Sequence, residues 1–171
     1  GEVGFDEYFG IPSSLDIPPY VWITATGVDA LPTDSVAGSG LRRNGGGGFW
    51  RAGRAAPGFD FQSVLPTITD RALSFIRRTV QESPERPFFV YLPLTAPHTP
   101  WLPDSAHTGR SEAGPYGDFV SQVDDVVGDV MGALDAAGVA ERTLLVFTSD
   151  NGAHWTPSDT TIWAHRANGP W

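Results

Sequence analysis

The sequence predicts an α/β fold in which a largely parallel sheet is flanked by helices. Two amphipathic segments, expected as helices at 66–82 and 116–137, alternate with two apolar runs, PFFVYLPL at 87–94 and TLLVFTS at 143–149. Apolar runs of this length are typical of strands buried in a parallel sheet, and their alternation with helices is typical of crossover connections. Loops at the carboxyl ends of such strands carry the functional residues in this fold class.

The first helix is predicted from apolar and β-branched residues that recur every three or four positions. They are Leu65, Ile68, Ala72, Phe75, Ile76, Thr79 and Val80. Thr67 and Asp70 have the spacing of a capping box at the start of this helix. Pro84 and Pro87 stop the helix, and the apolar run that follows is expected to be a fully buried strand.

The second helix is predicted from an apolar face and an opposite polar face. The apolar face contains Tyr116, Phe119, Val120, Val123, Val127, Val130, Met131 and Leu134. The polar face contains Asp118, Gln122, Asp125 and Asp129. Gly138 is expected to cap the C-terminal end of the helix, because glycine readily adopts the left-handed conformation needed there.

Residues 1–64 are rich in glycine, proline and aromatic residues and show no sustained period of 2 or 3.6. We expect this part to be mostly irregular, with one short strand at PPYVWITA (18–25). The run from Gly45 to Gly48 lacks the GxxxxGK spacing of a phosphate-binding loop, so it is expected to be a flexible surface loop. At 171 residues the chain is expected to form one domain, 1–171, composed of this loop-rich part and the α/β part at 65–171.

The composition argues against several functions. Eleven basic and 20 acidic residues give a net charge of −9, which does not suit a nucleic-acid partner. All the basic residues are arginine and there is no cysteine, so these residues supply neither a Lys nor a Cys nucleophile. No apolar run approaches the roughly 18 residues of a membrane span, so none is expected.

Oxygen-bearing side chains follow the second predicted strand directly. Asp150 and Asn151 come first, and Gly152 allows a sharp turn after them. Carboxylate and amide oxygens suit Ca²⁺ or Mg²⁺, although Asp-Asn-Gly is also a common tight turn. Two ligands do not complete a site by themselves.

A histidine follows the first predicted strand, in the stretch LTAPHTPWLP. Pro97 and Pro100 restrict the backbone on both sides of His98, so its imidazole could be held in one pose. A fixed imidazole there can donate to an anion or act as a general acid. Taken singly, His98 is also consistent with an ordinary histidine of a surface loop. In a parallel α/β sheet the ends of the two strands can share one cleft, which would bring His98 near Asp150 and Asn151.

Five stretches together resemble the formylglycine-dependent sulfatases of the alkaline-phosphatase-like superfamily. FFVYLPLTAPHTP, DDVVGDVMGALDAAG and TLLVFTSDNG occur in the order and spacing of that family. GFDEYFGIPSSLDIPPY is similar to a family segment with the pattern GIPxSxD, and the final HRANGPW is similar to the segment that precedes an active-site Lys. The resemblance implies a portion of an alkaline-phosphatase-like sandwich that hydrolyses sulfate esters.

Carried over by position, the resemblance implies that Asp150 and Asn151 bind a divalent cation, usually Ca²⁺, with Mg²⁺ as the alternative. It implies that His98 donates to the sulfate and protonates the leaving oxygen, and that Ser14 contacts the sulfate. Three further residues are expected near the substrate, namely Asp16, His154 and Trp155. Two histidines, His107 and His165, are expected on the surface.

The chain lacks other parts of the family pattern. It contains neither the CxPSR or SxPSR motif that supplies formylglycine, nor the early Asp-Asp pair of the cation site, nor the Lys. We therefore expect a fragment of a sulfatase catalytic domain that is inactive alone. The resemblance implies a sulfated small molecule or carbohydrate as substrate and a periplasmic, secreted or lysosomal location, and leaves the oligomeric state open.

Two other functions remain open. A phosphodiesterase or phosphonate hydrolase of the same superfamily would tend to use transition metals, which the Asp-Asn pair favours less than a hard cation. A degenerate binding module would keep the fold without the nucleophile.

Overall fold

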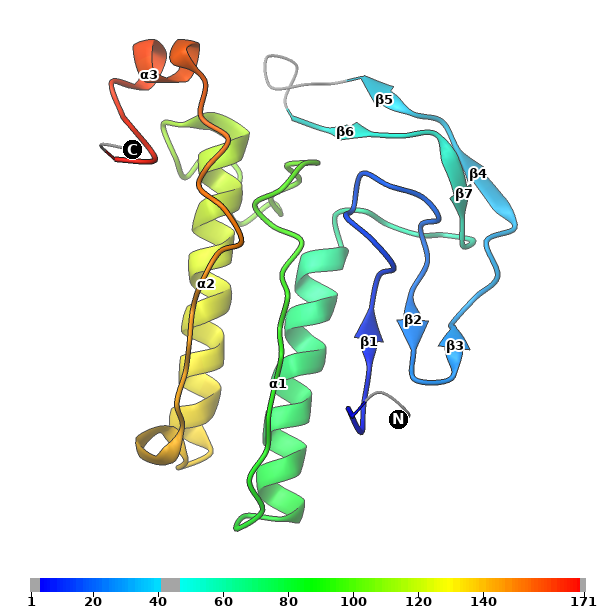
Figure 1. Ribbon diagram of the computed structural model, residues 1–171, viewed down its shortest axis with the longest axis vertical. Coiled ribbons are helices and arrows are strands. Elements are labelled where there is room, and N and C mark those ends of the chain that lie inside the picture. Colours follow the sequence, from blue (N-terminus) through cyan, green and yellow to red (C-terminus); the bar gives the residue numbers. More distant parts are fainter. Residues whose placement is uncertain (1–3, 41–46, 170–171) are drawn as a thin grey trace.

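The computed structural model describes residues 4–40 and 47–169. Short strands occupy the N-terminal part of the chain, and two long helices with extended segments beside them occupy most of the rest (Figure 1). None of the helices in these two ranges is long and apolar enough to cross a membrane.

The N-terminal part is mostly irregular, as the sequence indicated, and its short strands form three small antiparallel sheets within residues 4–40 and 47–63. One sheet has the order β1-β2-β3, and β4 pairs with β7 while β5 pairs with β6. The strands are β1 (Phe9–Gly10), β2 (Ile23–Thr24), β3 (Gly27–Val28), β4 (Asp34–Val36), β5 (Ser39–Gly40), β6 (Phe49–Trp50) and β7 (Gly53–Ala55). The strand predicted at 18–25 is thus confirmed only over its last residues.

The first predicted helix is confirmed as α1 (Val64–Glu82). Its buried residues lie at the predicted helical spacing and include Leu65, Ile68, Ala72 and Ile76. The predicted capping box at Thr67 and Asp70 is wrong. The helix begins earlier, after Ser63, so the N–H of Thr67 already donates to the carbonyl of Ser63 inside the first turn (2.9 Å).

The second predicted helix is confirmed as α2 (Gly114–Ala136). Gly138 follows it with a φ of 69°, as expected of a C-terminal cap. The N–H of Gly138 donates to Asp135 and that of Val139 to Leu134, which satisfies two of the last helical carbonyls. A short 3₁₀ helix, η2 (Ala140–Arg142), follows directly.

Two residues of the predicted polar face of α2, Asp118 and Gln122, are buried. The loop before the helix folds over this face and supplies their partners. The carboxylate of Asp118 accepts from the N–H groups of Gly109 (2.8 Å) and Ser111 (2.7 Å). The burial of the Asp118 and Gln122 side chains is tolerated because both are hydrogen-bonded.

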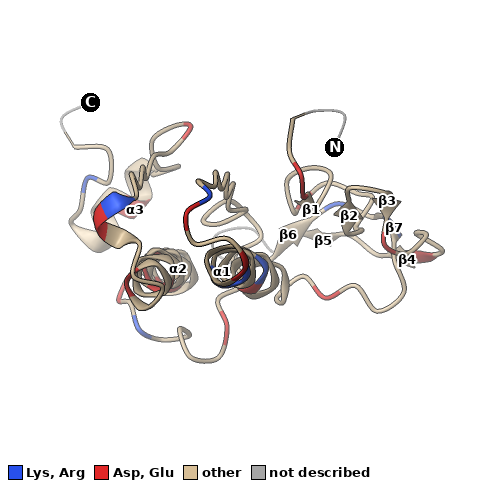
Figure 2. Cartoon of the chain, turned by 90° about the horizontal axis from the view of Figure 1, so that it is seen from below, with Lys and Arg blue, Asp and Glu red and all other residues tan. Residues whose placement is uncertain are grey.

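The two apolar runs are extended but do not form the predicted parallel sheet. Both run in the direction opposite to the helices, and both lie on the same side of the α1–α2 pair (Figures 1 and 2). Within the described ranges, residues 87–94 and 143–149 form no hydrogen-bonded ladder with any strand. The sheets that do form here are antiparallel.

The first apolar run is covered on one face, so the expectation of a fully buried strand is wrong. Alternate residues pack against the helices, namely Phe88, Val90, Leu92 and Leu94. The residues between them point away, and Phe89 and Tyr91 are 72% and 70% exposed. The second run is more open, with Leu144 88% exposed.

Among the described residues, the core consists of three apolar clusters along the helices. The cluster nearest the start of α2 joins Leu65 and Phe119 to Ala96 and Trp101, which follow the first apolar run. This packing holds the loop that carries His98 against both helices.

The predicted glycine loop is described only at its end. Gly45 lies outside the described residues, whereas Gly47 and Gly48 are buried rather than on the surface. Gly47 has a φ of 76°, and a Cβ there would lie 2.2 Å from the indole of Trp101. Only glycine permits so close an approach.

Candidate functional site

The His98 loop is held by buried neighbours, although His98 itself is exposed. Pro100 and Trp101 are buried on its C-terminal side. The indole N–H of Trp101 donates to the carbonyl of Pro97 (3.0 Å), and its backbone N–H donates to Gly47 (3.0 Å). The side chain of His98 is 63% exposed, so a fixed backbone presents the imidazole to solvent.

Ser14 and His98 meet although 84 positions separate them in the sequence. Nδ1 of His98 lies 3.1 Å from Oγ of Ser14 and 2.8 Å from the carbonyl oxygen of Thr99. The hydroxyl of Ser14 donates to Oδ1 of Asp16 (2.7 Å), which lies 4.0 Å from Nδ1 of His98. The structure thus joins three residues that the resemblance placed near the substrate.

Asp16 is the buried centre of this cluster, at 5% exposure. Its carboxylate lies 3.6 Å from Nη1 of Arg51. Its backbone is fixed as well, since its carbonyl accepts from the N–H of Arg51 (3.0 Å) and the hydroxyl of Tyr20 (3.2 Å). Burial, followed by the negative charge of Asp16, raises the pKa of Tyr20 above its ordinary value.

The predicted cation ligands lie at the end of the second apolar run, at the same end of the molecule as the His98 loop (Figure 1). Asp150 and Asn151 are exposed. The amide nitrogen of Asn151 donates to the carbonyl of Gly152 (2.8 Å), which leaves its amide oxygen as an acceptor for a ligand. No hydrogen bond or ion pair links either residue to His98 within the described ranges, so their convergence remains a prediction.

The donor types at these two positions suit a hard cation, but their number does not complete a site. A carboxylate and an amide oxygen are ligands that Ca²⁺ and Mg²⁺ accept. Ca²⁺ takes six to eight oxygens. In the part of the chain that the structure describes, no group of three or more His, Asp or Glu side chains is arranged to hold a metal.

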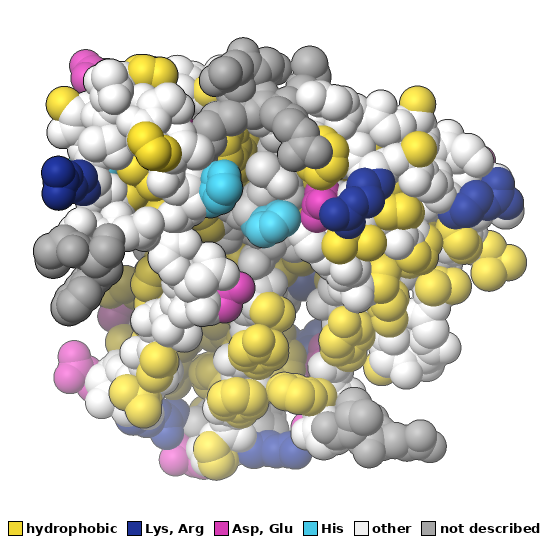
Figure 3. Space-filling model, turned by 45° about the horizontal axis from the view of Figure 1, so that its top comes forward, with side chains coloured by type: hydrophobic (Ala, Val, Ile, Leu, Met, Phe, Trp, Pro, Cys, Tyr) yellow, Lys and Arg dark blue, Asp and Glu magenta, His cyan; other side chains and the backbone are white. Residues whose placement is uncertain are grey.

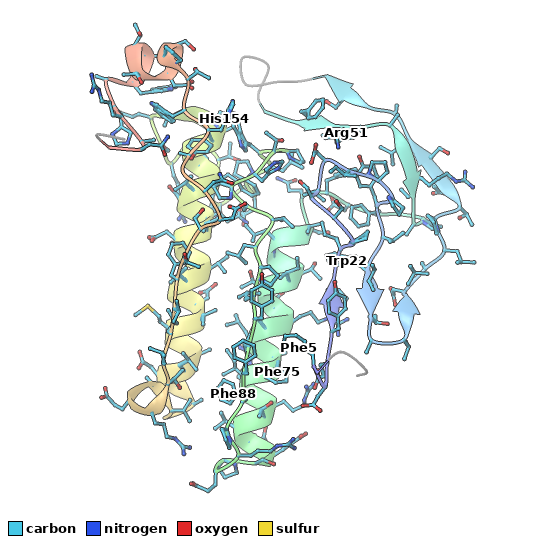
Figure 4. All side chains as sticks on the ribbon, viewed as in Figure 1. Phe5, Trp22, Arg51, Phe75, Phe88 and His154 are labelled. Atoms are coloured by element: carbon cyan, nitrogen blue, oxygen red, sulfur yellow. The ribbon has the colours of Figure 1, made fainter. Side chains whose placement is uncertain are left out.

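His154 and Trp155 lie at the same end of the molecule, where α2 begins. Figure 4 shows His154 and Arg51 there, on opposite sides of the His98 loop. The ring of Trp155 packs on Tyr116 (centroids 5.8 Å apart), and its N–H donates to the carbonyl of His165 (2.8 Å). The expectation that His154 and Trp155 shape the substrate subsite stays a prediction.

A small aromatic pocket adjoins Trp155. Its wall includes Trp101, Tyr116, Trp155 and Trp163, the last from α3 (Pro157–Trp163). Thr156 and Asp159 form a capping box that begins this helix.

His107 is buried, at 7% exposure, so its expected surface position is wrong. Nδ1 of His107 lies 2.6 Å from Asp104 and Nε2 lies 2.8 Å from Asp125, which also accepts from Arg110 (2.8 Å). Burial alone would lower the pKa of His107, but the hydrogen bonds to the two carboxylates outweigh it and raise the pKa. His165 is exposed, as expected.

Sequence reasoning did not identify Arg51 as part of the site. No motif marks it, because its place beside Asp16 depends on a backbone hydrogen bond between segments 35 residues apart. Figure 3 shows two histidine side chains together on this face, with an acidic and an arginine side chain beside one of them.

Comparisons with known proteins agree with the resemblance. The model of the family described as Sulfatase matches residues 47–169. N-acetylgalactosamine-6-O-sulfatase of Bacteroides thetaiotaomicron is 28% identical over 88% of this chain and 34% of its own length. Human arylsulfatase H is 38% identical over 59% of this chain and 17% of its own length. Mouse steryl-sulfatase is 41% identical over 56% of this chain and 15% of its own length.

A solved structure supports the same assignment. It is described in connection with the metabolism of multiple glycosaminoglycans by Bacteroides thetaiotaomicron, and it superposes with a TM-score of 0.69 at 26% identity. The superposition covers 87% of this chain and 36% of that one. The chain thus spans about a third or less of the length of these relatives. With the family model covering most of its residues, the chain belongs to the sulfatase family.

Proposed function

We propose that this chain is part of an enzyme that hydrolyses sulfate esters, and that it supplies the His98 side of the active site. The observation that carries the proposal is the 3.1 Å contact between Ser14 and His98, two residues at which the sequence matches family motifs. Two segments that match family motifs thus meet although 84 positions separate Ser14 from His98, which supports a shared site. Membership of the sulfatase family supports the choice of ester.

In this proposal His98 acts on the oxygen that leaves with the alcohol. Its imidazole is solvent-accessible on a fixed backbone, which suits a group that passes a proton to a bound substrate. Arg51 provides a positive charge close by, and the chain has no Lys to do so.

Asp150 and Asn151 would hold part of the shell of a Ca²⁺ or Mg²⁺ ion. Such an ion would stabilise negative charge on the sulfate oxygens. The chain contains neither a CxPSR nor an SxPSR sequence, so a formylglycine nucleophile would come from residues outside it. We therefore expect the 171 residues alone to give no measurable turnover.

The names of the relatives support a proposal for the substrate class. Their names include an N-acetylgalactosamine-6-O-sulfatase and a steryl-sulfatase, which act on a sulfated sugar and a sulfated steroid. We propose a sulfated carbohydrate or small molecule for this protein.

The test compares two esters with the same leaving group. The full-length protein is assayed with p-nitrophenyl sulfate and the phosphodiester bis(p-nitrophenyl) phosphate, and its metal content is measured. We expect faster hydrolysis of the sulfate and bound Ca²⁺ or Mg²⁺. Preference for the phosphate together with a transition metal would instead indicate a phosphodiesterase or phosphonate hydrolase.

A further inference from the structure

We propose that His107 forms a pH-sensitive latch that holds the segment between His98 and α2 on the surface of that helix. The latch consists of the imidazole of His107 and two carboxylates, Asp104 on the same loop and Asp125 on α2. We call residues 104–113 the latch loop. The inference goes beyond the proposed function, because the latch is a property of the fold and involves no substrate.

Both ring nitrogens of His107 contact carboxylate oxygens. Nδ1 lies 2.6 Å from Oδ1 of Asp104, and Nε2 lies 2.8 Å from Oδ2 of Asp125. An ionised carboxylate can only accept, so both contacts are hydrogen bonds only when both nitrogens carry protons. A neutral imidazole has a single N–H and would turn a lone pair toward one of the two carboxylates. The observed geometry is therefore that of the positively charged ring.

Arg110 is the other charged group beside this ring in the described part of the chain. Its guanidinium contacts the same oxygen of Asp125 (2.8 Å), and its positive charge opposes a charge on His107. The side chains of Arg110 and Asp125 are 47% and 52% exposed, so this pair by itself contributes little to holding the loop. The hydrogen bond from the buried, charged His107 is the stronger tie to Asp125.

Neutral contacts and a second carboxylate also join the latch loop to α2. The N–H groups of Gly109 and Ser111 donate to the carboxylate of Asp118. The side-chain amide of Gln122 accepts from the N–H of Asp104 (3.0 Å) and donates to its carboxylate (3.2 Å). These contacts do not require a charged imidazole. Loss of the proton from His107 is therefore expected to loosen the loop without unfolding the helix.

The latch loop continues the segment that carries His98. The buried Trp101 holds the start of this segment, because its indole N–H donates to the carbonyl of Pro97 (3.0 Å). Further along, the carbonyl of Pro103 accepts from the side chain of Gln62 (2.7 Å). The latch fixes the residues that follow. A closed latch thus stabilises the backbone that presents the imidazole of His98 to solvent.

The pH range of the closed latch follows from its three members. Burial alone would raise the pKa of Asp104, but hydrogen bonds to His107 outweigh burial and lower the pKa from its ordinary value of 3.8. Hydrogen bonds from His107 and Arg110 lower the pKa of Asp125 from the same value. The pKa of His107 is raised from 6.5. The contacts are therefore complete between about pH 3.8 and 6.5, and they weaken as the pH rises through the folded-state pKa of His107.

Hydrogen exchange of the full-length protein, followed by mass spectrometry, measures the opening of the latch loop. Protection is the ratio of the intrinsic to the observed exchange rate, which removes the direct effect of pH. Between about pH 5.5 and about pH 8.5, on either side of the imidazole pKa, protection of the latch loop should fall by about 10-fold or more in the wild type. α1 should stay more protected than the latch loop at both pH values, because the loop opens separately from the helices.

Two variants assign this change to the latch. His107→Gln should show low protection of the latch loop at both pH values. Asp125→Asn should lose much of the pH dependence, because an asparagine amide can face either form of the ring. Its side chain is half exposed, so this variant is expected to fold even if His107→Gln does not. Asp129→Asn, one turn further along the exposed face of α2, is the matched control and should behave as the wild type.

Protection of the wild-type latch loop that does not change with pH, or that falls equally in Asp125→Asn, would overturn the inference. Equal protection of the latch loop and α1 would also overturn it, since the loop would then open only with the whole fold. The measurement needs no substrate. A full-length protein that fails to hydrolyse sulfate esters would therefore reject only the proposed function.

Discussion

At the scale of single residues, the polar side chains of this protein are placed by partners distant in sequence. His107 contacts Asp104 beside it and Asp125 on α2, and these hydrogen bonds fasten the loop before the helix to its surface. The local sequence around His107 is polar and gives no sign that the side chain is buried, so a surface position was expected.

The His107 contacts predict a dependence of stability on pH. Because its pKa is raised above the value of the unfolded chain, near 6.5, its contribution to the free energy of unfolding is full below about pH 6.5. It is lost as the pH rises through the folded-state pKa. Urea denaturation of the wild type should therefore show stability falling over this range.

His107→Gln should remove most of this dependence and lower stability at acidic pH by roughly 1–3 kcal/mol. His165→Gln, at an exposed histidine, should leave the pH profile unchanged. Equal profiles for the wild type and His107→Gln would show that the contacts with Asp104 and Asp125 do not stabilise the fold.

Gly47 provides a second test at this scale. Gly47→Ala places a Cβ in the indole of Trp101 and in a left-handed backbone conformation, so we expect a loss of roughly 2 kcal/mol or more. Gly128→Ala, on the open surface of α2, should be neutral or stabilising. Thermal denaturation of both variants makes the comparison, and equal melting temperatures would contradict the close packing at Trp101.

At the scale of elements, the sequence predicted the two long helices well, but not η2 or α3, and it predicted the strands poorly. The spacing of Leu65, Ile68, Ala72 and Ile76 is a local property, and it placed α1 within two residues of its observed start. A strand depends on a neighbour that local sequence does not contain. The apolar runs are therefore extended, yet without the parallel ladder that their composition indicated.

The candidate site was predictable only in part, because local motifs mark some of its residues and contacts between distant segments place the others. Motifs identified His98 and Ser14, and the fold brought them together. Arg51 carries no motif, and its place beside Asp16 arises from packing alone.

The alternation along the first apolar run predicts unequal effects at neighbouring positions. Phe88 packs edge-on against Phe75, with ring centroids 6.3 Å apart (Figure 4). Tyr91, by contrast, is exposed to solvent. Phe88→Ala should destabilise the protein by about 2 kcal/mol, and Tyr91→Ala by less than about 0.5 kcal/mol. Chemical denaturation measures both, and the reverse order would show that the run presents its other face to the helices.

At the scale of the whole molecule, the two apolar runs leave a large hydrophobic surface on one side of the helix pair. Its most exposed members are Phe89, Tyr91, Leu144, Val146 and Phe147. Hydrophobic side chains are grouped across the lower part of the face in Figure 3. Apolar surfaces of this kind favour association.

We predict that the 171-residue chain self-associates through this surface. Light scattering should show the apparent mass increasing with protein concentration. Val146→Ser combined with Phe147→Ser should reduce the association without lowering the melting temperature, because both side chains are exposed. Ile162→Ser, at an exposed residue of α3, is the control, and a chain that stays monomeric at all concentrations would rule out association through the apolar runs.

The role of His98 is tested most directly by the release of inorganic sulfate from an aryl sulfate by the full-length protein. We expect turnover in the wild type and in His165→Ala, and a loss of about 100-fold or more in His98→Ala, since general acid catalysis contributes about that factor. Full turnover in His98→Ala would contradict the placement of the active site at the Ser14–Asp16–His98 cluster.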